Sequence, residues 1–447
     1  MTIPIRSRRA ISLAIGATLA IAVATGAALT VAVPWLNGTA PAVEVLAEAA
    51  RQRPLGATNL AVSNAASATR ETPDSPEALT RLGAALLEQV RVTADPSAYG
   101  RAETAFERAL TLAPDDPAAL IGLGSLALAR HEFVDALELG ERVRTIAPEI
   151  VITDGVIGDA QVELGRYDEA IETIQHMVDA RPDLASYSRV AYLRELHGDL
   201  DGAIAAMELA LAAGGPTVEN TEYVRVQLGH LQLAAGRPDL AERLYRASIA
   251  RLPGYVPAVG GLARVSIARG DFDEAIDLLT GATHRQPLPE LVVLLGETLE
   301  ADGRSDEAQV QYDLARAIQR LYEANGVMID LELAAFTAAH GDPSEALDLA
   351  RHAYEQRPTI FAADTLAWAL HRSGDDREAD RFAHEALRLG SRDARILYHA
   401  GAIADALGDT GRARELLTQA LAGSPAFSPL DGPRAERLLD RLPVATP

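Results

Sequence analysis

The sequence predicts an all-α protein built as a solenoid of about ten helix pairs, and two observations support this fold class. The first is a turn pattern, Gly-[Asp/Arg]-x-x-x-Ala, which is clearest at residues 165–170 and 270–275. The second is composition, because only 4% of the residues are aromatic and small side chains let helices pack closely. The closing alanine recurs at steps of 33, 34 or 38 residues, at Ala102, Ala136, Ala170, Ala203, Ala241, Ala275, Ala308, Ala346, Ala379 and Ala413. A period of this length indicates one repeat array instead of several globular domains.

The charge balance argues against nucleic acid as a partner. The chain has 41 basic and 63 acidic residues, and its formal net charge of −22 at pH 7 should repel polyphosphate. It contains no cysteine, which excludes disulfides, thiolate metal sites and a cysteine nucleophile.

The N-terminal segment predicts an association with a membrane. Residues 1–9 form a basic tail, and residues 10–33 carry no charge over a length sufficient to cross a bilayer core of about 30 Å. Because basic flanks stay in the cytoplasm, we expect a single-pass anchor in the cell membrane, with the array on the extracytoplasmic side. The alternatives are a signal sequence cleaved near Ala42, which gives a secreted or periplasmic protein that binds a small or carbohydrate ligand, and a buried soluble helix. Residues 34–72 are interpreted as a stalk followed by a degenerate half-repeat.

One unit of the array, residues 151–182, shows how each helix pair is built. Apolar residues at helical spacing predict a first helix that runs to Leu164, and Gly165 ends it in the left-handed backbone conformation. We expect Asp168 to cap the second helix and Pro182 to stop it. Neither helix can bury its apolar stripe alone, so each unit needs a neighbour.

Further repeated residues allow a comparison with a known family. They are a pair before the turn at Leu123-Gly124, Ile157-Gly158, Leu228-Gly229 and Leu295-Gly296, and a large residue four positions after the alanine at Phe106, Ile174, Tyr245 and Tyr312. In these features the chain resembles the tetratricopeptide repeat over residues 73–425. The resemblance implies a right-handed superhelix whose first helices line a concave groove that holds peptides or protein surfaces. Residues 426–447 are interpreted as a C-terminal cap and tail.

Three places depart from the regular repeat. Leu82-Gly83 lies unusually far before Ala102, which predicts an enlarged turn at residues 93–97. The two 38-residue steps place extra residues at 213–216 and around 318–326, where we expect loops.

The sequence carries no recognisable catalytic, cofactor or metal constellation. His131-Glu132 lacks the second histidine that a zinc-hydrolase helix carries four residues after the first. Gly122-Leu123-Gly124 lies inside a predicted helix with no strand before it, so it is not a dinucleotide-binding loop. We therefore predict that the chain is not an enzyme and needs no cofactor. The alternative is an atypical enzyme site in the groove that uses His371 near Asp364.

Specificity is expected on the inward side of the first helices. Large or polar residues that internal packing would not select occur there, at Asp159, Tyr192, Glu195, Tyr223, His230, Arg264, Glu297, Glu300, Phe361, Asp364, Trp368, His371 and Tyr398. Aromatic and arginine side chains among carboxylates suit recognition of a protein or peptide partner. The alternative is that the aromatic side chains only cover neighbouring helices. The sequence thus predicts a non-catalytic protein–protein interaction scaffold whose partner it does not identify.

Overall fold

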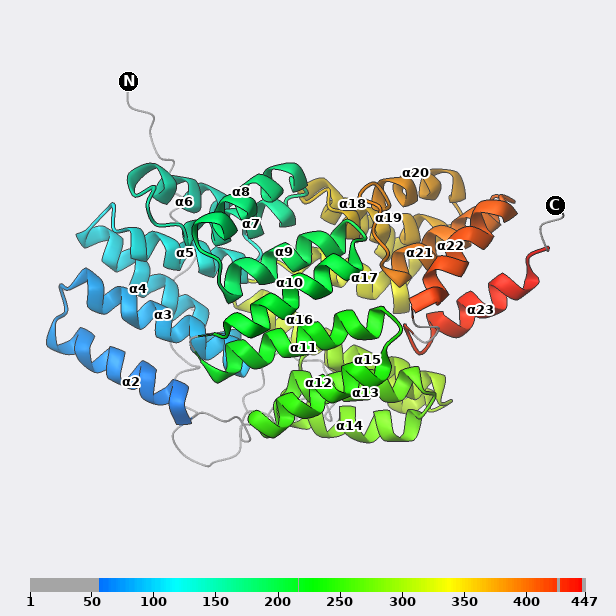
Figure 1. Cartoon of the computed structure of the whole chain (residues 1–447), viewed down its shortest axis with the longest axis horizontal. Coiled ribbons are helices and arrows are strands. Elements are labelled where there is room, and N and C mark those ends of the chain that lie inside the picture. Colours follow the sequence, from blue (N-terminus) through cyan, green and yellow to red (C-terminus); the bar gives the residue numbers. More distant parts are fainter. Residues whose placement is uncertain (1–55, 216, 424–426, 444–447) are drawn as a thin grey trace, which may run out of the picture. The chain divides into compact units, whose positions relative to one another are not determined.

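The computed structural model describes residues 56–215, 217–423 and 427–443, and all regular secondary structure within these ranges is helical (Figure 1). Twenty of the helices form ten consecutive pairs, as the repeat pattern predicts. The expected membrane anchor at residues 10–33 and the basic tail at residues 1–9 lie outside the described residues. No helix in the described ranges combines the length and the apolar character that crossing a membrane requires.

Each pair has a first helix and a second helix, and one helix flanks the array at either end. In chain order the pairs are α3 (Pro76–Thr93) and α4 (Tyr99–Leu112), α5 (Pro117–Ala129) and α6 (Phe133–Ile146), α7 (Thr153–Glu163) and α8 (Tyr167–Ala180), α9 (Leu184–Leu196) and α10 (Leu200–Ala213), α11 (Val218–Ala234) and α12 (Pro238–Arg251), α13 (Val256–Ala268) and α14 (Phe272–Arg285), α15 (Pro289–Ala301) and α16 (Ser305–Ala324), α17 (Asp330–His340) and α18 (Pro343–Gln356), α19 (Ile360–Arg372) and α20 (Asp376–Ala386), and α21 (Ala394–Ala406) and α22 (Thr410–Gly423). The flanking helices are α2 (Gly56–Glu71), which packs on α3, and α23 (Asp431–Arg441), which packs on α21 and α22.

The turn between α7 and α8 follows the predicted chemistry except at its cap. Gly165 has φ +73°, the left-handed conformation that glycine adopts without a steric cost. Asp168, however, does not cap α8, because Arg166 holds the cap position and makes no side-chain cap bond there. In the copy of this turn before α14, the cap position holds Asp271, whose carboxylate accepts a hydrogen bond from the Glu274 N–H. Asp168 instead lies exposed in the first turn of α8, where its charge favours the positive end of the helix dipole.

Glycines of the first helices make room for large side chains from the second helices. Tyr245 on α12 is fully buried, and its ring lies between Gly229 on α11 and Gly261 on α13. A Cβ added at either glycine would be 2.4 Å from the ring, so neither position tolerates a side chain without rearrangement. Phe106 on α4 contacts Gly122 on α5 in the same way. The glycine and the large residue that recur together in the repeat therefore pack against each other.

The irregular places in the array are only partly loops. The enlarged turn after α3 is confirmed, and it includes a short 3₁₀ helix at Pro96–Ala98. The first 38-residue step contains a break between Ala213 and Val218, as expected. The loop expected around residues 318–326 is wrong, because α16 continues to Ala324. Ile318 is only 2% exposed, so this extension carries on the buried stripe of the helix.

The first helices form the concave side of the array. Consecutive first helices contact one another from α3 to α13 and again from α17 to α21, whereas consecutive second helices make no comparable contact in the described ranges. In a curved stack the elements on the inside of the curve approach one another most closely. This confirms that the first helices line the concave side, which we call the inner face.

Successive turns of the superhelix touch along their edges. Tyr167 Oη at the start of α8 accepts a hydrogen bond from the Ile360 N–H at 3.0 Å, although the residues are 193 positions apart. Gln286 Nε2 donates to the Val92 carbonyl at 3.3 Å across 194 positions. In each case a residue next to the turn inside an early pair meets a residue at the junction between two later pairs.

Three turn glycines form the closest part of this edge. We call it the inter-turn contact, and its pairs are Gly165 with the Pro358 carbonyl, Gly198 with the Gly390 carbonyl, and Gly236 with the Gly423 carbonyl. A Cβ added at these glycines would lie 2.7, 2.3 and 2.5 Å from the respective carbonyl oxygens. Later turn glycines with the same conformation have no neighbouring atom within 4 Å in the described ranges, namely Gly270, Gly303, Gly374 and Gly408. Equivalent glycines in the repeat thus have different surroundings.

An apolar cluster continues across the same edge. Val162, Leu193 and Leu196 from the early pairs pack with Ile360 and Ile396 from the later pairs. All five side chains are at most 7% exposed. Because burial of apolar surface favours association, the two turns are joined by a packed core and not only by polar bonds.

Candidate binding site on the inner face

Two exposed tyrosines mark the middle of the inner face. Tyr192 on α9 is 36% exposed and Tyr223 on α11 is 48% exposed. Between the first helices α7 and α9, the Arg189 guanidinium donates to both carboxylate oxygens of Asp159, at 2.8 and 2.6 Å. This bidentate pair is geometrically specific, and it places a fixed polar group beside the two rings. Burial raises the pKa of both tyrosine hydroxyls, and the charge of Asp159 adds to this effect.

These tyrosines are surrounded by protein despite their exposure. Burial is the main cause that raises the pKa of both hydroxyls, since the neighbouring helices displace bulk solvent from around them. Exposed aromatic groups are typical of recognition sites.

A polar bridge links separate parts of the inner face. Arg91 at the end of α3 pairs with Glu219 at the start of α11, 128 positions away. Glu219 Oε1 also accepts a hydrogen bond from Tyr255 Oη at 2.9 Å. No sequence pattern indicated this bridge, because its members lie in different repeats and at different positions within them.

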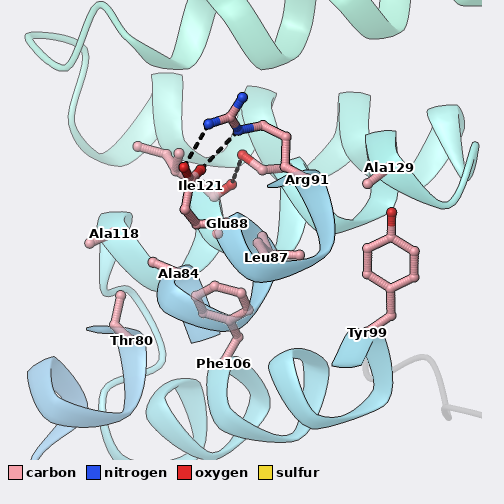
Figure 2. Close-up of a pocket in the computed structure, with 12 residues that line it drawn as sticks. Thr80, Ala84, Leu87, Glu88, Arg91, Tyr99, Phe106, Ala118, Ile121 and Ala129 are labelled. Carbon is pink, nitrogen blue, oxygen red and sulfur yellow. Dashed lines mark hydrogen bonds and ion pairs between the residues drawn. The ribbon is translucent and has the colours of Figure 1, made fainter. Parts of the chain in front are cut away.

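An apolar pocket of about 450 Å³ lies beside this bridge, between α3, α4 and α5 (Figure 2). Figure 2 shows the rings of Phe106 and Tyr99, which come from α4, and the pairing of Arg91 with Glu88 on α3. The remaining lining residues are Thr80, Ala84, Leu87, Ala118, Ile121, Gly122, Ser125 and Ala129. The pocket therefore offers an apolar surface with a charged edge.

Two charged residues of the array, Glu195 and Arg264, are also shielded from solvent by the surrounding protein. Although the Glu195 side chain is exposed, the surrounding protein displaces solvent from its carboxyl and raises its pKa to about 7, and the charge of Asp393 adds to this effect. Burial lowers the pKa of Arg264 on α13, and the nearby Arg395 contributes in the same direction. Arg395 belongs to α21, and the Asp393 side chain caps this helix.

Several other predicted site residues are engaged in internal packing. Glu297 on α15 is 6% exposed, and its carboxylate lies 3.3 Å from His340 Nε2. Burial opposes the charge of Glu297, yet the contact with His340 and the charge of Arg395 lower its pKa overall. His230 Nδ1 lies 2.8 Å from Tyr245 Oη, and Glu300 accepts a hydrogen bond from Tyr312 Oη at 2.8 Å. Burial lowers the pKa of His230 to about 3. These groups have partners within the chain.

A second group of predicted residues meets between α19 and α21. His399 Nδ1 lies 3.0 Å from both carboxylate oxygens of Asp364, and its ring stacks on Trp368 with 4.1 Å between centroids. Tyr398 is 5% exposed beside them, and burial raises the pKa of its hydroxyl to about 12. Phe361, one helical turn before Asp364, remains 37% exposed.

The alternative enzyme site is not assembled. His371 pairs with Asp376 at 2.6 Å, while Asp364 pairs with His399, so the expected proximity of His371 and Asp364 is wrong. The reason is helical geometry, because residues seven positions apart on α19 are two turns from each other. Nowhere in the described ranges do three or more His, Asp or Glu side chains converge in an arrangement that could hold a metal ion.

Sequence reasoning predicted Arg264 but missed three other cations, Arg91, Arg189 and Arg395. Asp159 lies on the first helix α7, and Arg189 lies on the next first helix, α9, one helical turn before the position equivalent to Asp159. This spacing is a signal that could have revealed the pair. Arg91 and Arg395 offered no such signal, because their neighbours are set by the superhelix.

Comparison with known proteins agrees with the repeat assignment. Models of the tetratricopeptide repeat match residues 97–149, 156–217 and 232–292. These three segments are therefore similar to tetratricopeptide repeats, a fold that is generally a non-catalytic scaffold for protein–protein interaction.

Two curated relatives and a solved structure show what the chain is similar to. It is 28% identical over 294 residues to cellulose synthase 1 operon protein C of Komagataeibacter xylinus, covering 63% of this chain. It is 28% identical over 325 residues to cellulose synthase operon protein C of Xanthomonas axonopodis pv. citri (strain 306), covering 69% of this chain. The matched part spans 19% of the length of each relative. A thermophilic tetratricopeptide-repeat protein of Thermus thermophilus is 24% identical with a TM-score of 0.37, covering 46% of this chain and 98% of that chain.

Proposed function

We propose that this chain is a non-enzymatic scaffold whose inner face binds a protein or peptide partner. The observation that carries the proposal is the exposure of Tyr192 and Tyr223 beside the Asp159–Arg189 pair. Neither tyrosine hydroxyl has a hydrogen-bond partner within the described residues, so both can bond to a ligand. A tyrosine ring supplies contact area at a low cost in conformational entropy, which makes it a frequent anchor in binding sites.

Not every predicted residue belongs to the proposed contact surface. Tyr192, Glu195, Tyr223 and Phe361 are exposed, so a partner can reach them. The buried Asp364, Glu297 and Tyr398 instead stabilise the helices that present this surface.

The proposed location is the extracytoplasmic side of the cell membrane, with residues 10–33 as the anchor. The uncharged length of this segment and the arginines before it support the proposal. Fractionation of the native host tests it, because full-length protein in the soluble cytosol would contradict an anchor. N-terminal sequencing of the mature chain separates the anchored protein from a secreted or periplasmic form cleaved near Ala42.

The names of the two curated relatives support the proposal that this chain acts in the cell envelope. Their names place them in cellulose synthase operons. Because the matched part is a minor share of each relative, we propose that the common property is the repeat scaffold. The partner of this chain would then be a component of an envelope assembly machinery.

The proposal is tested by comparing partner recovery between matched variants of the full-length protein in its native host. We expect Tyr192→Ala with Tyr223→Ala to lose a specific set of partners in affinity purification with mass spectrometry. The control is Ile171→Ala with Leu209→Ala, which removes side chains that are 41% and 52% exposed on second helices. Equal recovery by both variants would place the binding surface elsewhere.

A further inference from the structure

We propose that the junction between the seventh and eighth helix pairs binds a small zwitterion with an apolar side chain, of the chemical class of the free amino acids. The site is a cavity between α16, α17 and the start of α18. None of its residues belongs to the proposed contact surface for a protein partner. The inference therefore goes beyond the proposed function and can fail or succeed independently of it.

The junction between α16 and α17 differs from the other junctions of the array. Elsewhere the second helix of one pair contacts the first helix of the next, as α14 contacts α15 and α18 contacts α19. Between α16 and α17 the backbones come into hardly any contact within the described residues. In addition, α16 has 20 residues, whereas the second helices of the adjacent pairs, α14 and α18, have 14 each. The longer helix of the second 38-residue step thus stands apart from the next unit.

A cavity of about 260 Å³ lies at this junction. Its α16 wall includes Gln319, Arg320 and Glu323, all in the part of α16 that exceeds the length of α14 and α18. Its α17 wall includes Leu333 and Phe336. Ligand pockets typically have volumes of about 300–1,000 Å³, so this cavity suits a ligand at the small end of that range.

Two neighbouring side chains of the α16 wall carry buried polar atoms without a partner. Arg320 Nε and Gln319 Oε1 are buried and make no hydrogen bond within the described residues. The Arg320 guanidinium also lacks an ion pair there, whereas Arg316, one turn earlier, pairs with Asp313 at 2.8 Å. Buried polar atoms in proteins nearly always have a partner, because leaving one unpaired costs free energy. A ligand that pairs with both side chains removes this cost.

The charges that line the cavity are of both signs. Arg320 is a cation without an ion pair, and Glu323 and Glu345 are exposed carboxylates that make none within the described residues either. A guanidinium binds a carboxylate through two parallel N–H···O bonds, which define both the position and the orientation of the ligand. The two glutamates repel a simple anion and attract a cationic group on the same molecule. A ligand with one carboxylate and one ammonium group matches this arrangement.

The α17 wall favours an apolar part on the ligand. Phe336 is 7% exposed, and Leu333 and Ile329 are half-buried beside it in the lining of the cavity. The Arg316 guanidinium lies 5.3 Å from the centre of the Phe336 ring, an attraction that holds the ring in position. Burial of an aliphatic or aromatic side chain against these residues favours binding. An apolar amino acid such as leucine combines all the required groups.

Isothermal titration calorimetry of the full-length protein tests the site with L-leucine, L-valine and L-phenylalanine. We expect at least one of them to bind with a Kd below about 1 mM. Isocaproate lacks the ammonium of leucine and isopentylamine lacks the carboxylate, so each should bind at least about tenfold more weakly than leucine. Equal binding of either analogue would overturn the zwitterion assignment. If water alone pairs with the buried atoms, none of the amino acids gives saturable binding, and the site itself is overturned.

Matched variants assign the binding to this cavity. Arg320→Gln should weaken the binding of the amino acid at least about tenfold, because it removes the partner of the ligand carboxylate. The control is Arg243→Gln on α12, which removes an exposed arginine outside the cavity and should leave the Kd unchanged. Circular dichroism checks that each protein is folded. Native affinity in folded Arg320→Gln would overturn the proposal.

A further pair of substitutions tests the ammonium side of the site. Glu323→Gln with Glu345→Gln should weaken the binding of the amino acid but not that of isocaproate, which has no positive charge to lose. Equal weakening of both ligands would contradict a role of these carboxylates in binding the ammonium. Tyr192→Ala with Tyr223→Ala should bind the amino acid as the native chain does, so this result is separate from the test of the proposed function.

Discussion

Tyr167 Oη accepts a hydrogen bond from the backbone N–H of Ile360 at 3.0 Å, and both residues are buried. The two residues are 193 positions apart, although an array of repeats is usually stabilised by contacts between neighbouring units. This bond therefore makes the stability of the early pairs depend on the later pairs.

Tyr167→Phe should destabilise the array by about 1–3 kcal/mol, because it leaves the buried Ile360 N–H without its acceptor. Urea unfolding measures the loss. The control is Tyr354→Phe, whose hydroxyl makes no hydrogen bond in the described residues and whose ring packs on Phe382. That variant should change the free energy of unfolding by less than about 0.5 kcal/mol. Equal effects of the two substitutions would show that the long-range bond contributes nothing.

Gly236→Ala should be more destabilising than Gly270→Ala, although both glycines are left-handed, with φ +71° and +77°. Each substitution costs about 1–2 kcal/mol for the backbone conformation. Only the first also forces a Cβ to within 2.5 Å of the Gly423 carbonyl oxygen. The difference in urea midpoint measures that additional clash, and identical midpoints would contradict the inter-turn contact.

Two helical glycines should respond to alanine with opposite signs. Gly229→Ala places a Cβ 2.4 Å from the buried Tyr245 ring and should destabilise the array by about 1–3 kcal/mol. Gly281 on α14 has no neighbouring atom within 4 Å in the described residues, so Gly281→Ala should stabilise by about 0.5–1 kcal/mol through helix propensity. Thermal unfolding compares the two, and stabilisation by Gly229→Ala would contradict the ring-in-glycine packing.

Glu195→Gln should become increasingly stabilising relative to the native chain as pH rises from about 4.5 towards 7 and above. The folded pKa of Glu195 is raised from 4.5 to about 7, so in this window the folded state binds more protons than the unfolded state. Native stability therefore falls with rising pH, and glutamine removes that loss. Urea midpoints of both proteins at pH 5 and pH 8 measure the change.

Glu169→Gln is the control for the pH prediction. A hydrogen bond from Arg166 lowers the pKa of the Glu169 carboxyl, so its contribution is present above 4.5 and is lost as pH falls. Its substitution should be slightly destabilising at pH 8 and have less effect in acid. A parallel response of both variants would contradict the assignment for Glu195.

The local structure could be predicted from the sequence because the units repeat similar turns and similar packing contacts. Gly165 was expected to end its helix and does so. The fit of Tyr245 against Gly229 follows from a pairing that recurs in several units. The extension of α16 through residues 318–324 was missed, because a longer spacing between alanines does not distinguish an added loop from added helical turns.

The candidate site was predicted less completely. Helical register predicts Tyr192 and Tyr223 on the inner face, and both side chains are exposed. The burial of Asp364 and Tyr398 was not foreseen, because it depends on how closely α19 and α21 approach each other. Whether the exposed residues bind a partner stays a prediction.

By itself the sequence determined the helix pairs, their turns and the side of each pair that faces inward. These properties follow from local backbone preferences and from apolar spacing within about 34 residues. The tertiary structure alone decided that Gly198 meets a carbonyl whereas Gly303 does not. The physical reason is that the contact between turns depends on the summed rotation of all the intervening units, which no single repeat encodes.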